Sequence, residues 1–183
     1  KDPVQQSWPM PRDPLPIVIF GAGSIVRDAH IPAYQAMGLP ISGVYDPDIA
    51  KAEAIGVTFN VPVFPTIEEA ASKNDAIFDL ATPPAAHLEV LKALPEGAFA
   101  VMQKPMGSTL QDATAILNLC RARNLQACVN FQLRFAPMML ALKDFCDKGL
   151  MGEIVDIDMW VALDTPWGLW EFLTDVPRVE ILL

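Results

Sequence analysis

Short apolar runs separated by segments with helical spacing dominate the first two thirds of this chain. Each run is continuously apolar instead of alternating with polar residues, as expected for strands buried on both faces of a sheet. The runs that predict strands are Ile17–Phe20, Ile41–Tyr45, Asp75–Ala81, Ala98–Met102 and Leu125–Asn130, with a weaker one near Val61–Phe64. Pro62 predicts an edge or distorted position for the weak strand, because proline cannot donate a hydrogen bond to a sheet.

The segments between these runs carry helix signals. After the first run an apolar stripe extends to Met37, and Pro32 predicts a break at His30–Ile31 before the helix ends at Gly38. Other helices are expected at 47–54, from a capping box of Thr66 and Glu69 through Ser72, at 85–94, and from a cap at Thr109 or Ser108 through Asn124. Strict alternation of strand and helix predicts an α/β fold with a doubly wound parallel sheet covered on both faces.

The pattern changes after Asn130. A helix is expected at 136–148, closed by Gly149, and Ile154–Ala162 then alternates between apolar and polar side chains. Such alternation is typical of a strand in an antiparallel sheet. We therefore expect a Pro-rich N-terminal arm at 1–15, the parallel-sheet domain at 16–131, and the beginning of a second α/β domain with a mainly antiparallel sheet at 132–183.

The second domain is expected to be truncated, because one strand and one or two helices cannot close a core. The proline-rich arm can pack on the domain or on a partner, and its first residues could derive from cloning.

Composition and charge exclude several classes of partner. The 183 residues carry a formal charge of −9 and no cluster of Lys and Arg, so no nucleic-acid partner is expected. No apolar run reaches the roughly 18 residues that a membrane-spanning helix needs, so no membrane partner is expected. Cys120, Cys128 and Cys146 are odd in number and lack metal-ligand spacing. They favour a reducing, cytoplasmic compartment and predict no metal site.

The turn after the first strand is the most informative stretch. Gly21-Ala22-Gly23 turns the chain sharply, and Ser24 opens the following helix. Such a turn can cradle a pyrophosphate: the first Gly permits the tight turn, the second permits close approach of the backbone, and the N–H groups of the helix face the charge. Val26 stands where this fingerprint has a third small residue, so the packing of helix on strand is expected to be looser or shifted there.

Asp46, at the end of the second strand, has two candidate roles. It lies 20 residues beyond Val26, about where an acid binds the ribose hydroxyls of an adenine dinucleotide. With Pro47 at the first helical position it is also a good N-cap, and the two roles are compatible. A carboxylate at this position would repel a 2′-phosphate, so we expect NAD in preference to NADP.

Several further motifs follow in order along the chain. They are Gly21-Ala22-Gly23 with His30-Ile31-Pro32-Ala33, Val44-Tyr45-Asp46-Pro47, Ala81-Thr82-Pro83-Pro84 with His87, Gln103-Lys104-Pro105, Asn130 with Arg134-Phe135-Ala136-Pro137, Lys148-Gly149 and Gly152-Glu153-Ile154. In this combination the chain, from about residue 16 to its end, resembles the Gfo/Idh/MocA oxidoreductases, a family that includes glucose–fructose oxidoreductase and inositol dehydrogenase.

The resemblance implies a Rossmann domain and a C-terminal α/β domain whose open sheet commonly forms the oligomer interface, so a homo-oligomer is expected. It also implies hydride transfer between NAD(P) and a sugar- or polyol-like alcohol or carbonyl. Lys104 would then lie beside the nicotinamide and the reacting hydroxyl, where an ammonium can donate to an oxygen that gains charge. A cis Lys104–Pro105 bond would fit this family. The residues expected at the cofactor are Gly21, Gly23, Ser24, Ile25, Asp46, Ala81, Thr82, Pro83, His87, Gln103, Lys104 and Pro105.

Some positions leave alternatives open. Gln103 stands where the family usually has a glutamate, so it can hydrogen-bond but carries no charge. His30 is expected to be structural, because it lies in an apolar helical region, and His87 to be a helix-start residue near the cofactor. Arg134 could hold a substrate oxygen or form an ion pair within the second domain. Lys104 itself could be a solvated loop lysine.

The aromatic residues Trp160, Trp167, Trp170 and Phe172 could stack on a sugar ring, although packing in a core or interface is the better interpretation. The histidine and aspartate that the family carries downstream would lie beyond residue 183. The alternative to an enzyme is a non-catalytic regulator or sensor that binds a dinucleotide on the same fold, and the neutral Gln103 favours it.

Overall fold

The computed structural model describes residues 3–160 and residue 162. The contacts divide the chain into two compact units, one formed by residues 13–130 and the other by the residues up to 12 together with those from 131 onward. Within the described ranges, no helix has the length and apolar character needed to cross a membrane.

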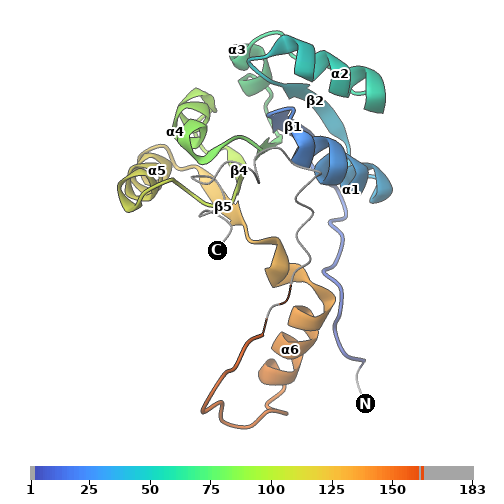
Figure 1. Ribbon diagram of the computed structural model, residues 1–183, viewed down its shortest axis with the longest axis vertical. Helices are drawn as coiled ribbons and strands as arrows, with labels where there is room; N and C mark the ends of the chain where they lie inside the picture. The colour runs from blue at the N-terminus through green and yellow to red at the C-terminus, as the bar shows by residue number, and fades with distance from the viewer. Residues whose placement is uncertain (1–2, 161, 163–183) are drawn as a thin grey trace. The chain divides into compact units, whose positions relative to one another are not determined.

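The unit of residues 13–130 is built on a five-stranded parallel sheet (Figure 1). The strands are β1 (Ile17–Phe20), β2 (Ile41–Tyr45), β3 (Ile77–Leu80), β4 (Phe99–Gln103) and β5 (Gln126–Asn130), in the order β2-β1-β3-β4-β5. All neighbouring pairs are parallel, which confirms the parallel sheet predicted from the apolar runs.

The weak strand predicted near Val61–Phe64 is reduced to a single bridge. Val63 pairs with Val44 in parallel, and the Val44 N–H donates to the Pro62 carbonyl at 2.9 Å. Pro62 has no N–H to return, so pairing does not extend. When this segment is counted beside β2, the spatial order is that of a Rossmann fold, in which the direction of winding reverses between β1 and β3.

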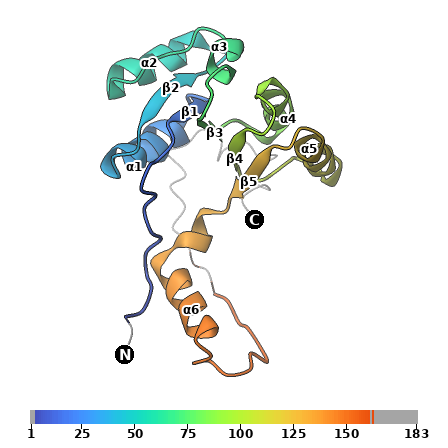
Figure 2. The ribbon, with the colours of Figure 1, turned by 180° about the vertical axis from the view of Figure 1, so that it is seen from behind.

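Helices pack on both faces of the sheet, as Figures 1 and 2 show for the two sides of the molecule. On one face lie α3 (Ile67–Ala71), α4 (Pro84–Ala93) and α5 (Leu110–Ala122), whose Ala70, Leu91 and Ile116 share a core with Phe20 and Phe78. On the other face lie η1 (Val26–His30), α1 (Ile31–Ala36) and α2 (Ile49–Phe59), whose Val26, Ile31 and Ile55 share a core with Ile19. Alternate residues of β1 therefore serve different cores, as the strand period requires.

Helices on both faces confirm the doubly wound sheet, although on the second face the helices of residues 13–130 lie over only part of it. Within residues 13–130, η1, α1 and α2 cover β1 to β3, while Phe99 on β4 is 41% exposed and Cys128 on β5 is exposed. The physical reason is the connection between these strands: α5 joins β4 to β5 across the α4 face and pairs with α4 there.

Two helix starts show how local signals decide the ends of elements. Thr109 caps α5 through a reciprocal capping box with Asp112, as its sequence position predicts. By contrast α2 begins at Ile49 with Asp48 in the N-cap position, so the N-cap interpretation of Asp46 is wrong. The side chain of Asp46 instead accepts from the N–H of Asp48 at 2.9 Å and forms a turn just before the helix.

The other unit joins the N-terminal arm to η2 (Gln132–Phe135) and α6 (Pro137–Asp147). Trp8 meets Phe135 edge to face, with ring centroids 5.5 Å apart, and the N–H of Gln5 donates to the Asp144 carboxylate at 3.3 Å. The helix predicted at 136–148 is confirmed, and Gly149 follows it with a φ of +68°. The arm therefore packs within this unit.

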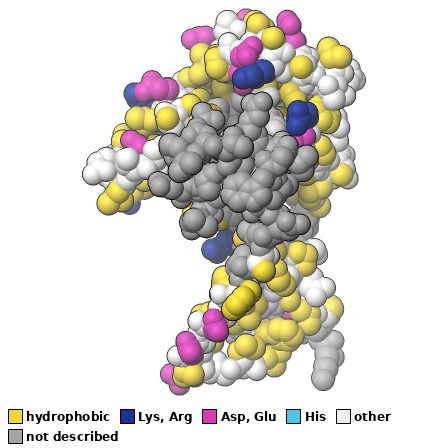
Figure 3. Space-filling view, in the orientation of Figure 1, with side chains coloured by type: hydrophobic (Ala, Val, Ile, Leu, Met, Phe, Trp, Pro, Cys, Tyr) yellow, Lys and Arg dark blue, Asp and Glu magenta, His cyan; other side chains and the backbone are white. Residues whose placement is uncertain are grey.

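The strand predicted at Ile154–Ala162 is not formed by the described residues of that range. Residues 154–160 have no regular structure, and both faces of the predicted alternation are exposed, including Val155 at 88% and Trp160 at 91%. The reason is that a strand gains stability only from a hydrogen-bonded neighbour. Hydrophobic side chains consequently gather on the visible face of this unit in Figure 3; the exposed ones include Met138, Leu142, Leu150, Met151, Ile154, Val155, Ile157 and Met159.

Candidate functional site

The glycine turn lies at the carboxyl edge of β1, at the switch point of the sheet. Gly21 has a φ of +106°, and a Cβ atom there would lie 2.6 Å from the carbonyl oxygen of Ala81. Gly23 has no atom within 4 Å of its Cβ position. The first glycine is thus required by the turn and by the strand beside it, while the second leaves open space where a ligand can approach the backbone.

The helix that follows begins with an unusual turn. Val26 is fully buried and is the first residue of η1, a π-helical turn that runs to His30 and continues into α1 at Ile31. A π turn is wider than an α turn and is frequent at functional sites. The winding changes from π to α between His30 and Ile31, where the sequence predicts a break, and the backbone stays helical there. The looser or shifted packing expected at Val26 stays a prediction. Ser24 is half-buried and Ile25 is 37% exposed beside the turn.

Asp46 is tied to the glycine turn by a direct hydrogen bond. Its Oδ2 accepts from the N–H of Ala22 at 2.8 Å, while the N–H of Gly21 donates to the carbonyl of Tyr45 at 2.7 Å. An ionised carboxylate offers about four acceptor positions, so a half-buried Asp46 with two backbone donors keeps capacity for ribose hydroxyls. The N–H groups left for a phosphate are those from Gly23 onward, at the start of the helix.

The loop after β3 lies against the same turn. The carbonyl of Ala81 lies directly against Gly21. The Oγ1 atom of Thr82 is buried and has no hydrogen-bond partner in the described part of the chain. A buried hydroxyl without a partner is rare in a folded protein and calls for a ligand or a water. Pro83 occupies the N-cap position of α4, where it directs the loop into the helix.

His87 is fully buried beneath two loops of this edge. Its Nε2 lies 3.1 Å from the carbonyl oxygen of Thr82, and its Nδ1 lies 3.1 Å from that of Met106. The ring therefore connects the loop after β3 to the loop after β4. With both nitrogens facing backbone carbonyls, the ring supports the edge from inside and presents no nitrogen to a ligand.

The loop after β4 carries the predicted catalytic lysine. Gln103 ends the strand, the Lys104–Pro105 bond is cis as expected, and all three residues are half-buried. The N–H of Lys104 donates to Oε1 of Gln103 at 3.0 Å. Since β4 neighbours β3 in the sheet, this loop follows the loop of Thr82 along one edge.

A buried polar chain beneath this edge was not predicted from the sequence. Asp79, in the middle of β3 and 2% exposed, accepts from Tyr34 Oη at 2.8 Å and lies 2.7 Å from Nδ1 of His30. Nε2 of His30 then lies 2.9 Å from Nε2 of Gln103. An ionisable residue inside an apolar strand was the available signal, because a buried charge requires partners.

Tyr34 donates a hydrogen bond to Asp79 in this group of buried polar side chains. Burial, together with the neighbouring carboxylate of Asp79, raises the pKa of the Tyr34 phenol far above its ordinary value. The hydroxyl therefore keeps its proton and donates to Asp79 at any pH the protein meets.

Arg134 and the C-terminal aromatic residues belong to the other unit. Arg134 lies in η2 with an exposed side chain, and Trp160 is exposed near the end of the described range. Trp167, Trp170 and Phe172 lie outside the described residues. Arg134 therefore stays a prediction as a substrate ligand.

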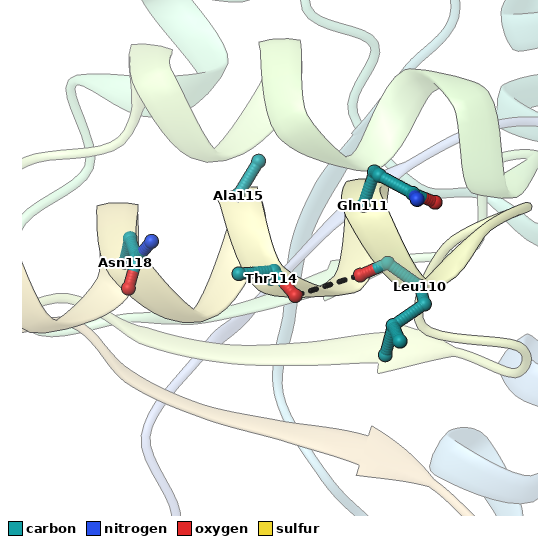
Figure 4. Close-up of a pocket in the computed structure, with 5 residues that line it drawn as sticks. All are labelled: Leu110, Gln111, Thr114, Ala115 and Asn118. Carbon is teal, nitrogen blue, oxygen red and sulfur yellow. Dashed lines mark hydrogen bonds between the residues drawn. The ribbon is translucent and has the colours of Figure 1, made fainter.

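Two hollows of the described surface lie away from these groups. One, of about 390 Å³, is lined by five residues that all project from α5 (Figure 4): Leu110, Gln111, Thr114, Ala115 and Asn118. The other, of about 460 Å³, lies between α2 and the segment after it. Neither includes a predicted cofactor residue, and a hollow on one helix offers few convergent polar groups. The predicted cofactor residues lie instead along the carboxyl edge of the sheet.

The residues of that edge fit a dinucleotide. An exposed helix start with an uncrowded glycine suits a pyrophosphate, and Asp46 suits a ribose. The Thr82 hydroxyl, which has no partner among the described residues, suits a further polar group of the ligand. Lys104 follows β4, one strand beyond Thr82 and two strands beyond the glycine turn along the same edge.

Comparison with known proteins points the same way. A family model described as an oxidoreductase family with an NAD-binding Rossmann fold, Gfo/Idh/MocA, matches residues 15–131. The protein YceM of Salmonella typhimurium, which is named as an oxidoreductase, is 29% identical over 130 residues, covering 70% of this chain and 42% of its own length. Glucose-6-phosphate 3-dehydrogenase of Bacillus subtilis is 28% identical over 143 residues, covering 77% of this chain and 40% of its own length.

Among solved structures, the WlbA dehydrogenase of Bordetella pertussis in complex with NADH and UDP-GlcNAcA superposes with a TM-score of 0.62 at 22% identity. The match covers 76% of this chain and 44% of that protein, and at this identity it shows the fold. The chain spans about two fifths of the length of the curated relatives it matches.

Proposed function

This chain belongs to the Gfo/Idh/MocA oxidoreductase family and carries its NAD-binding Rossmann domain. We propose that it binds NAD(H) for hydride transfer to or from a carbohydrate-like substrate. The observation that carries the proposal is the succession of three groups along one sheet edge. They are the glycine turn with Asp46, the unpartnered hydroxyl of Thr82, and the Lys104–Pro105 loop. This edge is where doubly wound sheets bind ligands.

Each group has one role in this proposal. The helix start at Gly23, Ser24 and Ile25 binds the pyrophosphate, and Asp46 accepts from the adenosine ribose. The bound nicotinamide supplies or accepts the hydride. Lys104 donates a proton or hydrogen bond to the substrate oxygen when the carbonyl is reduced, and accepts the proton when the alcohol is oxidised.

The class of substrate is proposed from the relatives. One relative is named for glucose 6-phosphate and one structural neighbour holds a sugar nucleotide. A sugar- or polyol-like alcohol presents the secondary hydroxyl that this chemistry needs. Arg134 is proposed to bind a substrate oxygen, and the second unit is proposed to continue into a substrate and oligomer domain.

The second candidate is a dinucleotide-binding regulator or sensor without turnover. Gln103 favours it, because a neutral amide stands where the family usually has a carboxylate beside the lysine. The two candidates share cofactor binding and differ in hydride transfer.

Replacing Lys104 by alanine separates the two candidates. NADH fluorescence titration should give the same affinity for Lys104→Ala as for the wild type, because the lysine acts at the substrate oxygen. Hydride transfer, followed by NADH absorbance with glucose 6-phosphate, other hexose phosphates and polyols as probes, should fall about 10²-fold or more. Lys92→Ala is the matched control: Lys92 is an exposed lysine of α4 paired with Glu89.

Two outcomes would contradict the enzyme. Unchanged turnover in Lys104→Ala would remove the lysine from the mechanism. NADH binding without turnover of any probe in the wild type would support the sensor.

Asp46 determines which dinucleotide is preferred. NADH should bind more tightly than NADPH, because the Asp46 carboxylate would face the extra phosphate at the same edge. Asp46→Asn should narrow that preference by about tenfold, since it removes the charge while keeping one acceptor oxygen. Competitive titration of both dinucleotides measures the ratio. Equal binding by the wild type would place the ribose elsewhere.

A further inference from the structure

We propose that Asp79, His30 and Gln103 form a positioning relay that holds the Lys104 loop from beneath the sheet edge. The relay connects β3, the turn η1 and the end of β4 through side chains that lie far apart in the sequence. The functional meaning rests on the proposed role of Lys104, while the relay itself is a structural claim that can be tested without a substrate.

The first support is the cost of placing Asp79 where it is. Asp79 lies on the central strand β3, between Ile19 of β1 and Val101 of β4, and is 2% exposed. A buried carboxylate is tolerated only when it is hydrogen-bonded or paired. Both Tyr34 and His30 meet its Oδ2, at 2.8 and 2.7 Å. Because the buried carboxylate of Asp79 requires this hydrogen bond, the bond holds the ring of His30 in one orientation.

The second support is the direction of each hydrogen bond, which follows from one fixed donor. The backbone N–H of Lys104 can only donate, so the atom of Gln103 that it meets is the amide oxygen. The amide nitrogen of Gln103 then faces Nε2 of His30 and donates to it. Since Nε2 accepts, the proton of His30 is on Nδ1 and is donated to Asp79.

The third support is the residue type at position 103. A glutamine both donates and accepts, so it can serve His30 and the Lys104 N–H at the same time. A glutamate would only accept at both contacts. With Gln103→Glu, the ring of His30 would need a proton on each nitrogen to satisfy two carboxylates. The neutral amide and the neutral ring are thus matched in this chain.

The relay ends at the backbone of the lysine. Oε1 of Gln103 holds the N–H of Lys104 directly before Pro105, and on the far side of the loop Nδ1 of His87 lies at the carbonyl of Met106. The loop is therefore held at both ends by the two histidines of the chain. A displacement of about 1 Å at a catalytic group can cost about 10²-fold in rate, so such supports matter for a positioned lysine.

Nitrogen NMR of the protein labelled with ¹⁵N-histidine tests the directions of the hydrogen bonds. With two histidines, His30 is assigned by its loss in His30→Asn. The wild type should show His30 with its proton on Nδ1 alone. Gln103→Glu should convert it to the doubly protonated ring at the same pH. Gln126→Glu adds the same charge at an exposed position of β5 and should leave the ring unchanged.

Hydrogen exchange at the Lys104 amide tests whether the relay reaches the lysine. His30→Asn places its amide nitrogen near the position of Nδ1, so it can keep the bond to Asp79 while losing the acceptor for Gln103. We expect faster exchange at Lys104 in His30→Asn and in Gln103→Leu, with unchanged amide spectra for α3, which packs on the opposite face of the sheet.

Three results would overturn the relay. They are a doubly protonated His30 in the wild type, a ring state unchanged by Gln103→Glu, and unchanged exchange at Lys104 in both variants. The proposed function is tested separately. A wild-type protein that does not bind NADH would contradict the proposed function, but it would not affect the NMR test of the relay.

Discussion

Gly21 and Gly23 lack a side chain for different physical reasons. At Gly21 an alanine would need a φ of +106° and would press its Cβ to 2.6 Å from the Ala81 carbonyl oxygen. Gly21→Ala should therefore lower the free energy of unfolding by about 1–3 kcal/mol. At Gly23 a Cβ meets nothing within 4 Å, so Gly23→Ala should change stability by less than about 1 kcal/mol.

Although Gly23→Ala should affect stability less than Gly21→Ala does, it should have a direct effect on NADH binding. An added methyl group at Gly23 would occupy the space where a pyrophosphate approaches the helix start, so Gly23→Ala should weaken NADH binding while the fold is kept. Urea denaturation and NADH titration of the two variants measure the two effects. Gly97→Ala, with a φ of +75° and no crowding atom, is a control for backbone conformation alone. Tight NADH binding by Gly23→Ala would place the phosphate elsewhere.

At the residue scale, the sequence predicted positions better than partners. The placement of Gly21 and Lys104 follows from short motifs at the ends of predicted strands. The contact of His30 with Asp79 joins residues 49 positions apart, and its contact with Gln103 spans 73. No local pattern encodes such pairs, because they depend on strand order and register. His30 was correctly expected inside the fold, yet its partners became visible only in the folded chain.

Among the elements, the predicted strands and helices were mostly recovered because their signals are local. Thr109 with Asp112 begins α5, and Gly149 follows α6. The failures have a common cause: a strand requires a neighbour. In Val61–Phe64 only Val63 is paired with a neighbouring strand. In Ile154–Ala162 the described residues are paired with no strand. Apolar pattern predicts the capacity to pair, and only the fold decides whether pairing occurs.

The packing of the N-terminal arm on α6 should depend on pH through Asp144. The pKa of Asp144 is lowered, chiefly by the hydrogen bond from Lys148. Burial opposes this effect, and the N–H of Gln5 lowers the pKa by a lesser amount. A lowered pKa in the folded state means that the stabilisation is present above the ordinary aspartate value, about 3.9. It is lost as the pH falls through the lowered value.

An NMR titration of the Gln5 amide measures this dependence. Its shift should move with a midpoint below the ordinary aspartate value, and Lys148→Gln should raise that midpoint because it removes the main cause of the lowered pKa. In Asp144→Asn the titration of the Gln5 amide should disappear. A Gln5 amide that does not respond to acid in the wild type would show that the arm is held by other contacts, such as Trp8 on Phe135.

At the scale of the whole molecule, the chain has two units with separate contacts, and only one carries the proposed dinucleotide site. A ligand that binds the folded state stabilises it by about 2.7 kcal/mol at a concentration of 100 times its Kd. NADH should therefore slow hydrogen exchange in β1, β3 and β4 of the sheet unit. The amides of α6, which pack with the N-terminal arm, should gain much less, because their contacts lie in the other unit.

Exchange measured by mass spectrometry, with and without saturating NADH, compares the two units in one sample. Gly23→Ala is the matched control, since it keeps the fold and removes the expected gain in the sheet. An equal gain in α6 would mean that the two units unfold together, because ligand stabilisation spreads through everything that opens in the same cooperative step. A gain confined to the sheet would make residues 13–130 an independent cooperative unit, whose stability is set by the dinucleotide at its carboxyl edge.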